Sequence, residues 1–441
     1  MKALKMDLDK QSEKIGFDKR GQFKEGKFAG YCHEQVPIIK TKGGIFYTLC
    51  PKDQIWVEIT DDDIKRMAYR MFPKEGKYIW RKKYENNYFQ LIKTLTNRVD
   101  KVDPCPHKIN FQNSVYDFKE FKHTIRNAKD YFSYEMDYSV LKEPQGTSIF
   151  DKFIDDITLN NETLKEHLLT VLAYLVSGDK KLQKFFILKG SGANGKSTLI
   201  NLLIKLIDKR FVTSISLGKI NDRFTLSKAL GKKLIVASEN ESVKEVSTET
   251  IKKLTGDDLV EIEQKYKDGF SAKLSVETLF ALNNTIKFSE NSHGLKRRLV
   301  VIPFDFRVEE KNMDIDLEEK LEEEIPSIMA KLIGIHKKFA ENGYKLPECE
   351  EVEKAKNKFL DEGIKNSLGN GIFDFLETNI IIDDTERVSK NDVYEAYINS
   401  NVGNATSTKF WMDFDKWKKY KEYGITEINS RGRQKIGMKL I

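Results

Sequence analysis

A glycine-rich stretch between apolar segments carries the residue types that bind phosphate. The pattern G-x-x-x-x-G-K-S is matched by Gly190-Ser191-Gly192-Ala193-Asn194-Gly195-Lys196-Ser197, with Thr198 next. The apolar run Phe185–Leu188 before it predicts a buried strand, and leucines after it recur at helical spacing. A strand, a glycine-rich loop and a helix in this order are the context expected of a P-loop.

In such a loop, glycines let successive backbone N–H groups turn inward around an anion, and the N-terminus of the next helix adds its partial positive charge. Lys196 is then expected to reach the β- and γ-phosphates, and the Ser197 hydroxyl to coordinate Mg²⁺. The motif therefore predicts binding of a nucleoside triphosphate, with ATP and Mg²⁺ as the expected ligands. A glycine-rich turn that binds nothing is the weaker alternative.

Two acids follow a second apolar run. Lys232–Ala237 predicts a buried strand, and Ser238, Glu239, Asn240 and Glu241 come directly after it. An apolar strand that ends in a carboxylate is the expected form of a Walker B element, in which one acid holds Mg²⁺ through water and one activates the attacking water. An ordinary acidic loop is the alternative, and the P-loop earlier in the chain favours the catalytic interpretation.

Two more apolar strands adjoin polar residues of catalytic type. The run Leu279–Leu282 ends in Asn283 and Asn284, and Arg297 and Arg298 stand directly before the run Leu299–Phe304.

Alternation on both sides of a Lys-Asp-Gly turn predicts a hairpin over Val260–Phe270. Lys265, Tyr266 and Lys267 stand near its tip, where the two lysines can face one side and contact the phosphate backbone of DNA without reading bases. The alternative is that these lysines only keep a surface hairpin soluble.

Composition and charge limit the classes of protein to which the chain can belong. The chain has 441 residues, 39% of them hydrophobic and 32% charged, and no run is long enough to span a membrane. The N-terminus does not resemble a signal peptide, and four scattered cysteines fit free thiols in a reducing cytoplasm. The net charge of +7 permits a nucleic-acid partner without establishing one.

The residues before the P-loop predict a mixed α and β unit. Residues 1–40 are polar and are expected to form a loosely ordered start, and Gly44–Leu49 with Ile55–Ile59 predicts a hairpin. Thr60-Asp61-Asp62-Asp63 is interpreted as the cap of a helix, with metal ligands of a polymerase-type primase as the alternative. Ile109–Phe118 predicts two short strands around a turn, and Phe150–Ser177 predicts two helices.

The C-terminal part predicts a compact DNA-binding module. Helices are expected from Asp316 to Phe339 and then to Phe359, followed by helices at Ile372–Thr378, Ser389–Ser400 and Thr408–Tyr420, and an alternating stretch at Thr426–Ile441. Three helices and a basic hairpin are the parts of a winged-helix module. Arg431, Arg433 and Lys435 are its candidate phosphate contacts, whereas Trp411 and Trp417 are expected in its core.

The ordered series of motifs resembles the superfamily 3 helicases, within the phage, plasmid and poxvirus primase–helicase family that includes replication helicases of bacterial mobile elements. The motifs concerned are Gly190–Thr198, the strands ending in Glu239 and in Asn283-Asn284, Leu254–Asp258, and Gly294–Arg298. The resemblance implies an AAA+ ATPase that assembles as a hexameric ring around DNA and works with other replication proteins.

The resemblance also implies roles for single residues. Lys196 and Ser197 hold phosphate and Mg²⁺, Glu239 is the Walker B acid, and Asn284 is the sensor that places the lytic water. Arg297 or Arg298 is the finger that reaches the neighbouring subunit, and Lys265 or Lys267 lies on the channel hairpin. Many members carry two adjacent acids, whereas Ser238 precedes Glu239 here. The choice between Glu239 and Glu241 as metal contact therefore stays open.

The expected fold is α/β, an AAA+ P-loop core with a mostly parallel sheet and flanking helices. The expected parts are an N-terminal α+β domain (1–145), a helical collar (146–180), the ATPase core (181–306), a helical segment (307–366) and a winged-helix domain (367–441). The expected function is an ATP-driven DNA helicase. A primase–helicase with an unrecognised primer-synthesis site, a small-molecule kinase and a P-loop DNA-binding regulator are the alternatives.

Overall fold

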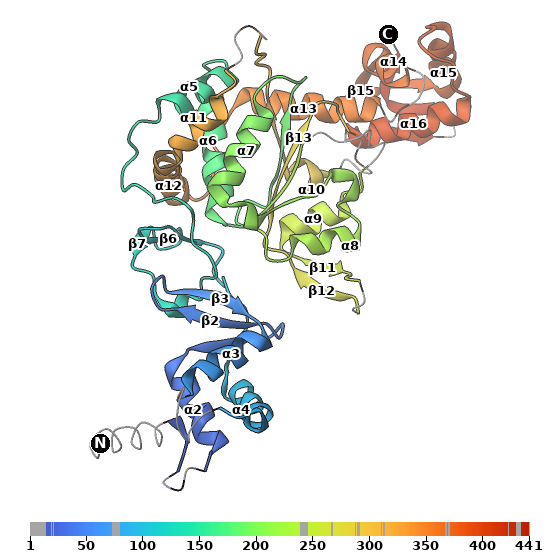
Figure 1. The fold of residues 1–441 in the computed structure, drawn as a ribbon. Coiled ribbons are helices and arrows are strands. Elements are labelled where there is room, and N and C mark those ends of the chain that lie inside the picture. The colour runs from blue at the N-terminus through green and yellow to red at the C-terminus, as the bar shows by residue number, and fades with distance from the viewer. Residues whose placement is uncertain are drawn as a thin grey trace. The chain divides into compact units, whose positions relative to one another are not determined.

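The computed structural model describes the chain except for residues 1–14, 19, 21, 73–79, 239–245, 266–267, 287, 289–291, 310, 312–313, 367, 369–370, 422, 429–433 and 441. At residues 238, 428 and 434–436 it describes the backbone only. Contacts divide the chain into two compact units, Met1–Val140 and Leu141–Ile441 (Figure 1). Each unit is described by itself.

The first unit packs helices against a four-stranded sheet of order β3-β2-β1-β4. The helices are α2 (Glu25–Gln35), α3 (Asp61–Met71) and α4 (Lys82–Leu95), and the strands are β1 (Ile38–Thr41), β2 (Phe46–Cys50), β3 (Ile55–Ile59) and β4 (Asn97–Val99). The β2–β3 hairpin confirms the predicted one. The expected loosely ordered start is wrong from Ile15 onward, because Ile15, Phe17 and Phe23 are buried in the core of this unit, and α2 adds Phe28, Ala29 and Cys32 to it.

Thr60 and the acidic run that begins α3 cap that helix, as predicted. The Asp63 amide donates to the Thr60 hydroxyl (3.2 Å), and the Thr60 amide donates back to the Asp63 carboxylate (2.9 Å). This reciprocal pair is a capping box, which satisfies two amides that would otherwise lack partners. Asp61 pairs with Lys93 of α4 at 2.9 Å. Asp61 and Asp63 thus stabilise the fold of the first unit.

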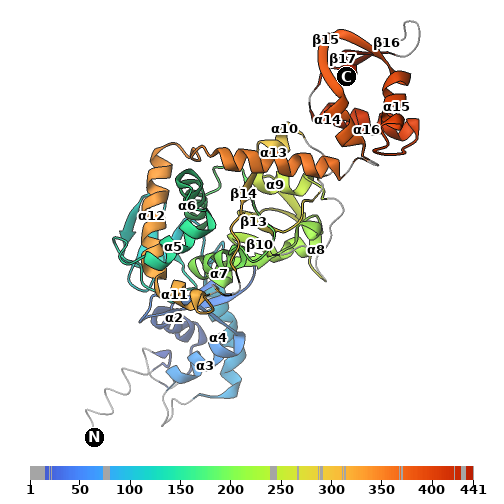
Figure 2. The same ribbon diagram turned by 90° about the horizontal axis from the view of Figure 1, so that it is seen from above.

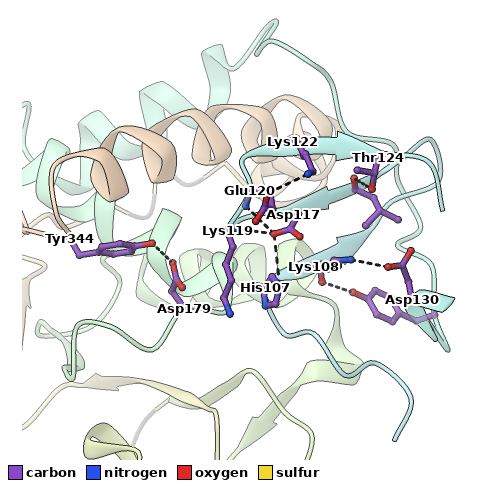
Figure 3. A network of polar contacts seen from close by, with 12 residues as sticks. His107, Lys108, Asp117, Lys119, Glu120, Lys122, Thr124, Asp130, Asp179 and Tyr344 are labelled. Carbon is purple, nitrogen blue, oxygen red and sulfur yellow. Dashed lines mark hydrogen bonds and ion pairs between the residues drawn. The ribbon is translucent and has the colours of Figure 1, made fainter. Parts of the chain in front are cut away.

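A second, three-stranded sheet completes this unit, with β5 (Lys108–Asn110), β6 (Val115–Asp117) and β7 (Lys122–Thr124). It confirms the short strands expected around residues 109–118. Asp117 accepts the amides of Lys119 (2.9 Å) and Glu120 (3.2 Å) and lies 3.9 Å from His107 (Figure 3). These bonds fix the β6–β7 turn.

The second unit is built on a five-stranded sheet of order β14-β8-β13-β10-β9. The strands are β8 (Phe185–Lys189), β9 (Val212–Ser214), β10 (Leu234–Ser238), β13 (Glu277–Leu282) and β14 (Leu299–Pro303). Every neighbouring pair is parallel. The apolar runs predicted as strands are therefore confirmed, and β8, β13 and β14 are almost wholly buried because helices cover a parallel sheet on both faces.

Helices α5 (Ser148–Ile157), α6 (Glu162–Ser177), α11 (Leu317–Glu323) and α12 (Ile325–Glu341) group beside α7 (Lys196–Ile207), as Figures 1 and 2 show. The carboxylate of Glu324, which lies between α11 and α12, accepts the amides of Ile149 (3.0 Å) and Phe150 (2.8 Å) and so caps the start of α5. The helices α8 (Arg223–Leu226), α9 (Glu249–Gly256) and α10 (His293–Lys296) are short. The two helices expected over 150–177 are confirmed.

The C-terminal elements follow the long helix α13 (Glu350–Lys365). They are α14 (Ile372–Asn379), β15 (Ile380–Ser389), α15 (Lys390–Asn399), α16 (Ser407–Tyr420), β16 (Thr426–Ile428) and β17 (Gln434–Leu440), and the strands pair antiparallel in the order β15-β17-β16. The three predicted helices and the terminal hairpin are confirmed, and Trp417 is buried in the core as expected. Strand β15 was not predicted, because charged residues and a bulge after Asp383 interrupt its alternation.

Candidate nucleotide-binding site

The P-loop joins the buried strand β8 to helix α7, as the sequence predicts. A side chain on Gly190 would place its Cβ 2.4 Å from the Phe304 carbonyl oxygen, so only glycine fits there. Gly192 and Gly195 have φ angles of +104° and +81°, which residues with a side chain rarely adopt. The loop conformation thus requires the glycines of the motif.

Lys196 begins α7 and is 5% exposed. Its ammonium donates to the Gly190 carbonyl (3.0 Å) and to the side-chain oxygen of Asn194 (2.8 Å). Asn194, 2% exposed, uses its amide nitrogen to donate to the Phe304 carbonyl at 2.9 Å. Asn194 therefore joins the lysine to the segment after β14, a positioning role that the motif alone did not indicate.

The five parallel strands bring their carboxyl ends to one edge of the sheet, where α/β proteins bind ligands. Leu282 pairs with Lys189, and the Gly190 amide donates to the Leu282 carbonyl at 3.1 Å. Ser238, the last residue of β10, pairs with Ala281. The predicted acids Glu239 and Glu241 lie outside the described residues. Glu239 follows Ser238 directly in the sequence.

The two asparagines after β13 have different surroundings. Asn283 follows Leu282 directly, its side-chain oxygen is buried, and its carbonyl accepts a bond from the Lys189 ammonium at 2.8 Å. Asn284, the residue expected as sensor, is exposed. Burial lowers the pKa of Lys189, with Glu362 opposing this shift and Lys358 adding to it. The strand register, which the sequence does not show, makes Asn283 the asparagine adjacent to the P-loop.

Helix α13 contacts both the loop after Asn284 and the C-terminal elements. The Thr285 hydroxyl donates to the Glu362 carboxylate. The next residue toward the N-terminus, Asp361, accepts a bond from the Tyr420 hydroxyl at 2.5 Å. Lys296 of α10 donates to the Tyr420 carbonyl at 3.1 Å. Neighbouring carboxylates of one helix thus hold the loop of the candidate site and the end of α16.

The two candidate finger arginines also differ. Arg297 is exposed. Arg298 donates to the Thr255 hydroxyl (3.0 Å) and to the Gly294 carbonyl (2.9 Å), which ties α10 to α9. Burial and the neighbouring Arg297 lower the pKa of Arg298, and Asp258 offsets part of this.

The predicted hairpin is confirmed, with β11 (Leu259–Ile262) paired antiparallel to β12 (Phe270–Lys273). Lys265 lies beyond the end of β11 and is exposed, and Tyr266 and Lys267 lie outside the described residues. Arg223 of α8 pairs with Glu261 (2.7 Å) and Glu263 (3.3 Å). These ion pairs join α8 to β11 and to the residue that follows it.

In the C-terminal hairpin, Arg431 and Arg433 lie outside the described residues. Lys435 lies on β17, where its Cα is opposite Glu427 and Val388, and its side chain is not described.

No helix among the described residues is long and apolar enough to cross a membrane. Within the same residues, no three His, Cys, Asp or Glu side chains gather as a metal site would require.

Three comparisons place this arrangement among known proteins. Residues 188–298 match the model of a family described as "Family of unknown function (DUF5906)". The chain is 26% identical over 218 residues to "Putative helicase L207/L206" of Acanthamoeba polyphaga mimivirus. That match covers 47% of this chain but only 23% of the viral protein, so the chain corresponds to less than a quarter of that relative's length.

Solved structures show the same fold over nearly the whole chain. The apo structure of the NrS-1 C-terminal region (305–718) superposes with a TM-score of 0.56 at 13% identity and covers 95% of this chain and 100% of that chain. An A form of the apo NrS-1 C-terminal region gives a TM-score of 0.54 at 13% identity, over 91% of this chain and 96% of that one. The chain is a mixed α/β protein with the fold of the NrS-1 C-terminal region, and is similar in sequence to part of a viral helicase-like protein.

Proposed function

We propose that the chain is an ATP-driven DNA helicase that acts in replication as a hexameric AAA+ ring of superfamily 3. The observation that carries the proposal is the buried Lys196, held at the start of α7 by a glycine-dependent loop that follows an interior strand of the parallel sheet. The sequence similarity to a viral protein named as a helicase supports the same function.

The proposed reaction is hydrolysis of ATP. Lys196 balances charge on the β- and γ-phosphates, and an asparagine after β13 orients the attacking water. Ser197 and one of the acids Glu239 and Glu241 would hold Mg²⁺, with Glu239 the expected one, and the other acid would activate the water. Bound Mg²⁺ supplies neutralisation of the charge that develops on the phosphates. The glycine-lined loop next to a helix N-terminus fits such an anion with its metal.

The remaining features support a motor on DNA better than a small-molecule kinase. The arginine pair suits a finger in trans, and the β11–β12 hairpin with exposed Lys265 suits a contact to the DNA backbone. The order α14-β15-α15-α16-β16-β17, three helices with an antiparallel sheet, supports the assignment of a winged-helix module.

The test compares ATP hydrolysis with and without single-stranded DNA, together with unwinding of a forked duplex. Wild type should hydrolyse ATP faster with DNA and unwind the fork, whereas Lys196→Ala should do neither. Lys265→Ala combined with Lys267→Ala should keep basal hydrolysis and lose unwinding. DNA binding without stimulated hydrolysis would instead favour a P-loop DNA-binding regulator.

Particle images with an ATP analogue and DNA test the ring. Six-fold particles are the expected result. A monomer that is fully active as an ATPase would exclude the hexamer. Primer synthesis by the same chain would favour the primase–helicase alternative.

A further inference from the structure

The segment that follows β14 is bonded to the P-loop. The Phe304 amide donates to the Lys189 carbonyl (2.7 Å), and the Val308 amide donates to the Ala193 carbonyl (3.0 Å). Between these bonds, the Asn194 side chain donates to the Phe304 carbonyl at 2.9 Å. Residues 304–308, called the β14 extension below, therefore run beside the first half of the loop.

The β14 extension carries one arginine, Arg307, whose charge makes no contact that stabilises the described fold. Its side chain is exposed, and among the described residues no hydrogen bond or ion pair involves its guanidinium. It directly precedes Val308, whose amide is bonded to the P-loop. A guanidinium binds phosphate oxygens through paired N–H groups, so its place beside a phosphate-binding loop indicates a ligand contact.

The strand order indicates which part of the nucleotide Arg307 meets. Strand β8 lies between β13 and β14, and β10 lies beyond β13. The γ-phosphate must face the asparagine after β13 and the acids after β10, which both follow strands on one side of β8. The β14 extension follows the strand on the other side of β8. It therefore adjoins the part of the nucleotide that is remote from the γ-phosphate.

We infer that Arg307 binds the diphosphate part that ADP and ATP share. This inference rests on the proposed nucleotide site and adds a binding residue outside its sequence motifs. Lys196 and the loop amides then bind the phosphates from inside the P-loop, and Arg307 binds them from the side of the loop that faces the β14 extension. The nucleotide would keep this contact after hydrolysis, since the contact does not involve the phosphate that leaves.

The test is a calorimetric titration of the full chain with ADP and with a non-hydrolysable ATP analogue. Arg307→Ala should weaken the binding of ADP and of the ATP analogue by a similar factor, roughly ten- to a hundredfold, as expected for loss of a hydrogen bond to a charged group. Arg307→Lys should recover part of the affinity. The thermal midpoint without nucleotide should not change, because the side chain is exposed and unpaired in the described structure.

Lys311→Ala is the matched control. Lys311 is an exposed cation just beyond the β14 extension, but its ammonium pairs with Glu309 at 2.7 Å. Its removal should leave both affinities unchanged. Unchanged binding in Arg307→Ala, an equal loss in Lys311→Ala, or a loss confined to the ATP analogue would each overturn the assignment.

Lys196→Ala separates this inference from the proposed function. If Lys196→Ala no longer binds nucleotide while Arg307→Ala binds it as the wild type does, the proposed nucleotide site is supported and the role of Arg307 is refuted. If the folded wild type binds neither nucleotide, the proposed function falls, and the role of Arg307 falls with it.

Discussion

Replacing Asn194 with alanine should both destabilise the protein and weaken nucleotide binding. The change removes the bond to the Phe304 carbonyl (2.9 Å) and the acceptor of the Lys196 ammonium (2.8 Å). A neutral hydrogen bond contributes about 1 kcal/mol and one to a charged group about 2 kcal/mol, which together give about 3 kcal/mol for this buried site. Without Asn194, Lys196 also loses a group that orients it toward the phosphates.

The entropy of unfolding is about 2.1 cal/mol/K per residue, so for a unit of about 300 residues about 3 kcal/mol corresponds to a fall of roughly 5 °C in the apparent melting midpoint. The measurement is thermal unfolding followed by dye fluorescence, combined with a titration with ADP. Asn201→Ala is the matched control, because Asn201 lies on α7 but makes an exposed bond to Glu318 at 2.9 Å. That variant should melt within about 2 °C of wild type, as surface substitutions usually do.

The reasoning is refuted if Asn194→Ala melts and binds ADP as the wild type does. It is also refuted if Asn201→Ala shows an equal loss, since the effect would then belong to α7 in general.

Three other outcomes follow from the geometry. Asn283→Ala should lower the ATP hydrolysis rate about 10²-fold while keeping ATP binding, and Asn284→Ala should stay near wild type; the reverse result would restore Asn284 as the sensor. Mixing Arg297→Ala or Arg298→Ala protomers with Lys196→Ala protomers should restore part of the ATP hydrolysis at the mixed interfaces. If hydrolysis does not recover at any mixing ratio, neither arginine acts as a finger in trans. Burial raises the pKa of Asp179, but hydrogen bonds from His336 (2.9 Å) and Tyr344 (3.0 Å; Figure 3) outweigh it and hold the pKa below the ordinary 3.8. Its stabilisation is therefore present above pH 3.8 and lost as the pH falls below it, so Asp179→Asn should flatten the acid side of a stability–pH curve measured by urea unfolding.

Local features of the structure could be predicted from the sequence because neighbouring residues decide them. The P-loop requires glycine where φ is positive, and the Thr60–Asp63 capping box needs only two side chains three positions apart. The buried strands of the parallel sheet were visible as apolar runs, and the β11–β12 hairpin as alternation around a turn.

Features that join distant segments were not predictable in this way. Helix α2 looked too polar to fold, yet Phe28 and Cys32 pack in a core whose other members include residues of α3, α4, the sheet and the segment before α2. Strand β15 has a weak pattern and exists because β17, some fifty positions later, supplies its hydrogen-bond partners.

The sequence by itself determined the local pattern of the candidate site, since residue types and spacing around Lys196 predict a phosphate-binding loop. The tertiary structure decided which other residues meet that loop. Only the strand order shows that Asn283 adjoins Gly190, and that the segment bearing Arg307 lies on the opposite side of β8. The physical reason is that the neighbours of a residue in the sequence set its backbone conformation. Its neighbours in space depend instead on how strands far apart in the chain pair.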